Sequence, residues 1–154
     1  MSELVHFLAH ALELESRAGE RYGRLARHME GLGKPEVAAL FGRMGEFSFR
    51  HAGEIRRLAL PQGPLPRLSS WQFDWPDPEP PEVGDLARTH ADMTVEEALD
   101  FAIANERSGR DYYLRMALSA ADARTRRMAA GFAGEESEHV QILERWLETI
   151  TPPS

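Results

Sequence analysis

The chain has 154 residues, which predicts a single domain (1–154) large enough to fold around its own core without a covalent staple. It contains no cysteine, which excludes disulfides, thiolate metal sites and iron–sulfur clusters. This composition fits a reducing compartment, and we expect a cytoplasmic protein. A formal net charge of -7 argues against a nucleic-acid partner. The N-terminus does not resemble a signal peptide, and no apolar run is long enough to cross a membrane.

Apolar residues recur at helical spacing in four stretches. Pro35, after Gly31-Leu32-Gly33, is a favourable first helical position for the second stretch. The third begins with a capping box, in which Thr94 is the cap and Glu97 lies three residues further on. Asp122 is a suitable cap for the fourth. We therefore predict helices at about residues 2–30, 35–60, 94–119 and 122–150.

The connections predict the topology. Short links make the first two helices antiparallel neighbours, and likewise the last two. Segment 61–93 contains seven of the ten prolines, which prevent a helix from continuing. It is long enough to pass along a helix of about 40 Å, so the second and third helices can run parallel. We expect Trp71, Phe73 and Trp75 to attach this segment to the helices; the alternative is a disordered linker. The predicted fold is all-α, a ferritin-like four-helix bundle of two antiparallel helical hairpins joined by a long crossover.

Ionisable residues interrupt the apolar stripe of every predicted helix. An ionised carboxylate in an apolar core is costly unless it is paired or binds a metal. Two interpretations follow: the residues hold a metal, or they form a polar network without one, in which Glu106 could pair with protonated His139. The residues concerned are Glu15, His51, Glu106, Glu136 and His139.

Spacing favours the metal interpretation. Glu136 and His139 lie one turn apart on one face, where they can share an ion. In ferritin-like di-iron and di-manganese proteins, two helices give a single Glu and the other two give Glu-x-x-His. This chain supplies Glu15 and Glu106 singly, and the complete Glu136-x-x-His139 in the last helix. Carboxylate and imidazole also suit zinc and manganese, so the ligands alone do not select the metal.

These motifs resemble those of the rubrerythrin family. Glu15 to Tyr22 is similar to the family's first-helix motif, and Glu135-Glu136-Ser137-Glu138-His139 to its fourth-helix motif. The resemblance covers all four helices and is to members that lack a rubredoxin domain. It implies a di-iron site that reacts with peroxide or dioxygen.

The resemblance also implies a role for each residue. Glu15 and His51 would serve one metal, Glu106 and His139 the other, and Glu136 would bridge them. A phenol can hydrogen-bond a ligating carboxylate, a role implied for Tyr22 and Tyr113; packing in the core is the alternative for both tyrosines.

Helix two departs from the family pattern. Ser48 stands three residues before His51, where a second bridging Glu is expected, and Gly109 occupies the place of an additional Glu of the third helix. Three carboxylates cannot neutralise two divalent ions, so the His51 side should bind more weakly. We expect two iron ions, or one held by Glu106, Glu136 and His139.

Three functions are compatible with these residues. The first is a peroxidase or ferroxidase with an external electron donor. The second is a non-redox protein that binds a single metal, and the third is a metal-free helical interaction module. We expect a homodimer by family analogy. The remaining histidines are read as surface or boundary residues without a role: His6, His10, His28 and His90.

Overall fold

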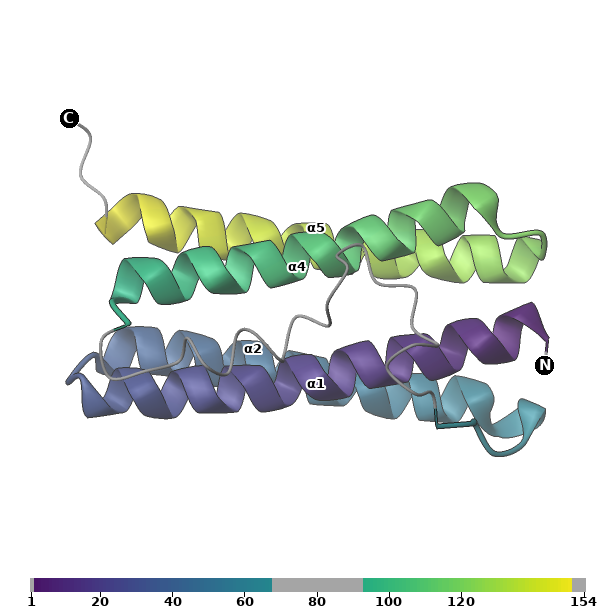
Figure 1. The fold of residues 1–154 in the computed structure, drawn as a ribbon, viewed down its shortest axis with the longest axis horizontal. Coiled ribbons are helices and arrows are strands. Elements are labelled where there is room, and N and C mark those ends of the chain that lie inside the picture. The colour runs from purple at the N-terminus through teal and green to yellow at the C-terminus, as the bar shows by residue number, and fades with distance from the viewer. Residues whose placement is uncertain (1, 68–92, 151–154) are drawn as a thin grey trace. The chain divides into compact units, whose positions relative to one another are not determined.

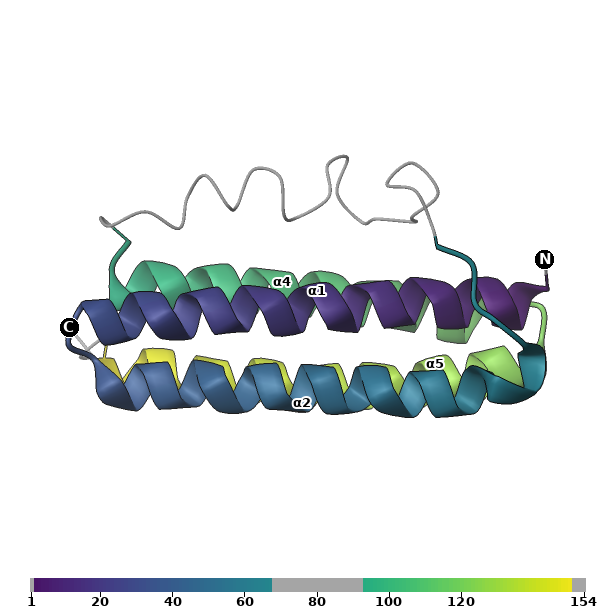
Figure 2. The same ribbon diagram turned by 90° about the horizontal axis from the view of Figure 1, so that it is seen from below.

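A computed structural model describes residues 2–67 and 93–150, which form two antiparallel helical hairpins (Figures 1 and 2). Each bound of the four long helices differs by at most one residue from the predicted one. The elements are α1 (Glu3–Gly31), α2 (Pro35–Ala59), the short 3-10 helix η1 (Leu60–Gln62), α4 (Val95–Ser119) and α5 (Ala123–Ile150).

Local chemistry sets the ends of α1 and α2, the first hairpin. Ser2 Oγ accepts a hydrogen bond of 3.1 Å from the Val5 N–H and so caps the start of α1. The chain then turns at Gly33, whose φ of 73° lies in the left-handed region that glycine adopts without strain. Pro35 opens α2 at a position where a backbone N–H is not needed.

Glycine allows α1 and α2 to approach each other closely. A Cβ atom at Gly45 of α2 would lie only 3.3 Å from Tyr22 Cβ and 3.5 Å from the Gly19 carbonyl oxygen, both on α1. The Tyr22 ring stacks on Phe41 of α2, with ring centroids 6.0 Å apart. Aliphatic and aromatic side chains of both helices fill the buried interior, among them Phe7, Leu8, Leu25, Met29, Leu40, Met44 and Ile55.

Side-chain caps start both helices of the second hairpin, α4 and α5. The predicted capping box is present, because Thr94 Oγ1 accepts from the Glu97 N–H and Glu97 Oε1 accepts from the Thr94 N–H, each at 3.1 Å. Asp122 Oδ2 accepts from the Thr125 hydroxyl at 2.7 Å and from the Thr125 N–H at 3.0 Å. These two hydrogen bonds, the hydroxyl one first, lower the pKa of Asp122.

The turn Ala120–Thr125 packs with the first hairpin. Glu3 of α1 accepts hydrogen bonds from two backbone N–H groups of this turn, from Ala121 at 3.0 Å and from Asp122 at 2.7 Å. The carboxylate of Glu3 therefore occupies the position next to the start of α5, where a helix favours negative charge.

The reading of His10 as a surface or boundary residue is wrong: its exposed fraction is 0%, because residues 7–11 are all buried and α1 is enclosed on more than one side there. Helical spacing also puts Phe47 and Leu58 on the apolar stripe of α2, but these two side chains are 44% and 37% exposed. Trp71, Phe73 and Trp75, expected to attach the crossover, lie outside the described residues, as does His90. None of the helices in the described ranges combines the length and apolar character needed to cross a membrane.

Candidate metal centre

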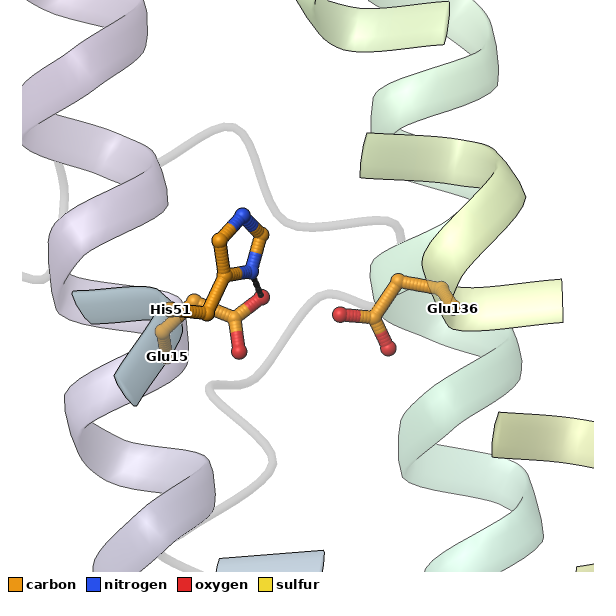
Figure 3. Close-up of side chains that lie close together, drawn as sticks. All are labelled: Glu15, His51 and Glu136. Atoms are coloured by element: carbon orange, nitrogen blue, oxygen red, sulfur yellow. Dashed lines mark ion pairs between the residues drawn. The ribbon is translucent and has the colours of Figure 1, made fainter. Parts of the chain in front are cut away.

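In the first hairpin, Glu15 of α1 faces His51 of α2. Glu15 Oε1 and His51 Nδ1 lie 3.2 Å apart, and both side chains are buried (Figure 3). Ser48, one helical turn before His51, is also buried. The hairpin therefore places one carboxylate and one imidazole together, with a hydroxyl where the family pattern has a second carboxylate.

In the second hairpin, Glu106 of α4 meets Glu136 and His139 of α5. His139 Nδ1 lies 3.6 Å from Glu106 Oε2 and 3.8 Å from Glu136 Oε2. One ligand atom from each of the three residues lies within 4.8 Å of the other two. Glu106 and Glu136 are buried, whereas the side chain of His139 is 15% exposed. Figure 3 also labels Glu136, with its carboxylate extending from α5.

The spacing of these atoms suits a shared ion better than direct hydrogen bonding. Distances of 3.6 and 3.8 Å from His139 Nδ1 are too long for N–H···O hydrogen bonds. Two ligands bound to one tetrahedral ion at about 2.1 Å are separated by roughly 3.4 Å. Small side-chain movements would therefore bring Glu106, Glu136 and His139 around a common ion.

The charges of these three residues also favour a bound metal ion. Glu106 and Glu136 place two buried carboxylates near one imidazole nitrogen. A protonated His139 would leave a net charge of -1 in this group, and burying a net charge is costly. A divalent cation with neutral His139 would bring the charge of the group to zero. The donor set therefore fits a divalent metal ion that prefers oxygen and nitrogen ligands.

The two predicted tyrosines lie in aromatic packing. Tyr22 stacks on Phe41, as described above, and Tyr113 contacts Phe132 edge-on with ring centroids 5.4 Å apart. Their suggested hydrogen bonds to ligating carboxylates stay a prediction. Tyr112, which helical spacing did not indicate as buried, lies in the interior beside Tyr113, with ring centroids 5.5 Å apart, and under the Arg115 guanidinium. Consecutive side chains on a helix diverge, so a single-stripe reading could not place both tyrosines in the interior.

Gly109 of α4 lies next to the Glu136 side chain. A Cβ atom at this position would lie 3.9 Å from both Cδ and Oε2 of Glu136. The sequence marked Gly109 only as the place of a missing Glu, and the structure shows that this place faces a candidate ligand. The residue itself is partly exposed.

The chain is similar to a known protein family and to a solved crystal structure. The Rubrerythrin family profile matches residues 6–62, which include most of α1 and all of α2. A crystal structure of an uncharacterised conserved protein from Magnetospirillum magnetotacticum MS-1 is 42% identical in sequence, with a TM-score of 0.82 over 99% of each chain. No curated protein matches the chain.

The chain belongs to the rubrerythrin-like family of ferritin-like proteins. The predicted fold class is confirmed as well, an all-α ferritin-like four-helix bundle. The group Glu106, Glu136 and His139, in which both carboxylates are buried, has the donor types and spacing that can hold a metal ion.

Proposed function

We propose that the chain binds iron and either reduces peroxide, with electrons supplied by a separate donor, or oxidises Fe(II), with peroxide or dioxygen as the oxidant. The observation that carries this proposal is the convergence of Glu106, Glu136 and His139 in the second hairpin. The rubrerythrin-like family supports iron as the metal. The resemblance alone supports a homodimer.

Each ligand has a proposed task. By the family motif, Glu106 and His139 would hold one ion, Glu15 and His51 would hold a second, and Glu136 would contribute to both. A pair of ferrous ions would supply the two electrons that reduction of peroxide requires. Glu15, Glu106 and Glu136 are buried, so bulk water has little access to these carboxylates.

A metal ion bound by Glu15 and His51 should replace the contact that these two side chains make with each other in the metal-free protein. His51 Nδ1 lies within hydrogen-bond distance of Glu15 Oε1 at 3.2 Å, so a proton can be shared between them in the metal-free protein. A cation at Glu15 and His51 would compete with that proton. Binding of a metal ion at Glu15 and His51 is therefore expected to release that proton.

The first test is iron content per chain after anaerobic loading with Fe(II). We expect about two ions in the wild-type protein and loss of both in Glu136→Ala, because the bridging carboxylate serves both. Exposed Glu138, two residues further along α5, gives the matched control Glu138→Ala, which should load normally. Addition of peroxide to loaded protein should then oxidise the bound iron. Loaded protein that does not react with peroxide would refute the redox part of the proposal.

A second candidate function is a non-redox protein with a single metal. Buried Ser48 favours it, because a hydroxyl supplies no negative charge to the Glu15 and His51 side. One tightly held ion per chain, lost in Glu106→Ala and retained in Glu15→Ala, would select this function. Absence of binding by Fe, Mn or Zn would instead leave a metal-free polar network.

A further inference from the structure

Gly109 lies beside a specific oxygen of the candidate site. The nearest atoms to a Cβ at this position are Cδ and Oε2 of Glu136, both at 3.9 Å. The same Oε2 atom lies 3.8 Å from His139 Nδ1. One carboxylate oxygen therefore faces the imidazole of α5 and also the place where residue 109 has no side chain.

The second hairpin offers an ion three ligating side chains, which is fewer than the four to six ligands that divalent metals take. Metal sites with three protein ligands keep a further position for water or an external ligand. Glu106 and Glu136 are buried, whereas His139 and Gly109, which neighbour the Glu136 carboxylate, are partly exposed.

Size and charge limit what can bind there. A single methyl group at position 109 would be in van der Waals contact with the Glu136 carboxylate and would occupy space beside it that glycine leaves open. With neutral His139, the two carboxylates make the site neutral around a divalent ion and leave a charge of +1 around a trivalent one. A small anion is therefore attracted more strongly to the oxidised form than to the reduced form.

We propose that Gly109 keeps open a coordination position beside Glu136 at which a small anion from solvent binds the ion held by Glu106, Glu136 and His139. The inference rests on the proposed metal site and adds the residue that determines access to it. Gly109 acts by the absence of a side chain, so adding one methyl group tests it directly.

The experiment titrates azide, a small linear anion, into Fe(III)-loaded protein and follows the visible charge-transfer absorption that azide gives on binding iron. Gly109→Ala is the test variant, and Gly109→Val extends the obstruction. Gly134→Ala is the matched control, because a Cβ at exposed Gly134 of α5 has nothing within 4 Å. Iron content is measured for every protein, and circular dichroism checks the helices.

We expect azide to bind the wild type and Gly134→Ala equally. Gly109→Ala should bind it at least about ten times more weakly and Gly109→Val more weakly still, with unchanged iron content. Fe(II)-loaded wild type should bind azide less tightly than the Fe(III) form. Equal azide affinity in wild type and Gly109→Ala at equal iron content overturns the inference while the metal site stands. Iron-loaded wild type that binds no azide overturns it too. If no protein retains iron, the proposed function fails and the inference fails with it.

Discussion

Removing one buried negative charge from the second hairpin should abolish most of the thermal stabilisation that a bound metal ion gives the protein. Glu106→Gln keeps the shape of the side chain but removes its charge. A carboxylate and a unit positive charge about 4 Å apart attract by about 4 kcal/mol at an effective dielectric constant of 20. A loss of about 2.7 kcal/mol of that attraction already weakens affinity about 100-fold.

The expected loss of affinity can be measured as a smaller metal-induced rise in melting temperature (Tm). At a free metal concentration about 100 times its Kd, an ion stabilises the folded protein by about 2.7 kcal/mol. For a chain of this size that raises Tm by about 5–10 °C. At the same concentration, an affinity about 100 times weaker leaves about 0.4 kcal/mol. Glu106→Gln should therefore melt within about 2 °C of its metal-free form.

The assay is thermal unfolding followed by circular dichroism, with and without Mn(II), whose oxygen-rich coordination suits the site without redox side reactions. Exposed Glu138→Gln is the matched control and should keep the wild-type shift. Without metal, Glu106→Gln should be no less stable than the wild type, because it removes one of two buried like charges. Wild type and Glu106→Gln with the same metal-induced shift would refute the assignment of Glu106 as a ligand.

Three further predictions concern other parts of the chain. Gly45→Val should lower stability by about 1–3 kcal/mol relative to Gly53→Val in chemical denaturation, because a Cβ at Gly45 meets Tyr22 Cβ at 3.3 Å and one at Gly53 meets nothing within 4 Å. Asp122→Ala should lower Tm at neutral pH. The folded pKa of Asp122 lies below its ordinary 3.8, so this stabilisation is complete above that value and is lost as pH falls through the folded pKa, where wild type and variant should converge. Ser48→Glu should destabilise the metal-free protein, because it buries a further charge, and should tighten binding of the second ion in a metal titration.

Interactions between residues three or four apart in sequence were predictable. The Thr94–Glu97 capping box and the Asp122 cap have residues of the right type at the right spacing, and the structure contains both. Burial of the five candidate ligands was likewise indicated by helical periodicity. In the structure Glu15, His51, Glu106 and Glu136 are buried, whereas His139, which periodicity also placed on an inward face, has a side chain that is 15% exposed.

Contacts between residues far apart in the sequence could not be predicted from sequence patterns. Glu3 and Ala121 are 118 residues apart, and an acidic residue in a first helical turn is expected whether or not a second helix lies near it. Periodicity also assigns each helix a single buried face. It therefore could not show that His10 and Tyr112, which lie beside the expected stripes, are enclosed as well.

The two hairpins differ in how many charges they bring to a metal. The second contributes Glu106 and Glu136, whose two negative charges balance a divalent ion by themselves. The first contributes Glu15 alone, because buried Ser48 is uncharged, so an ion held by Glu15 and His51 keeps a surplus positive charge. If Glu136 bound both ions, its negative charge would partly neutralise the second ion, but the first ion would then be less completely neutralised. The two ions should therefore bind in separate steps, the first tighter than the second. A reaction that needs both ions at once would then depend on metal concentration, whereas anion binding beside Gly109 would need only the first.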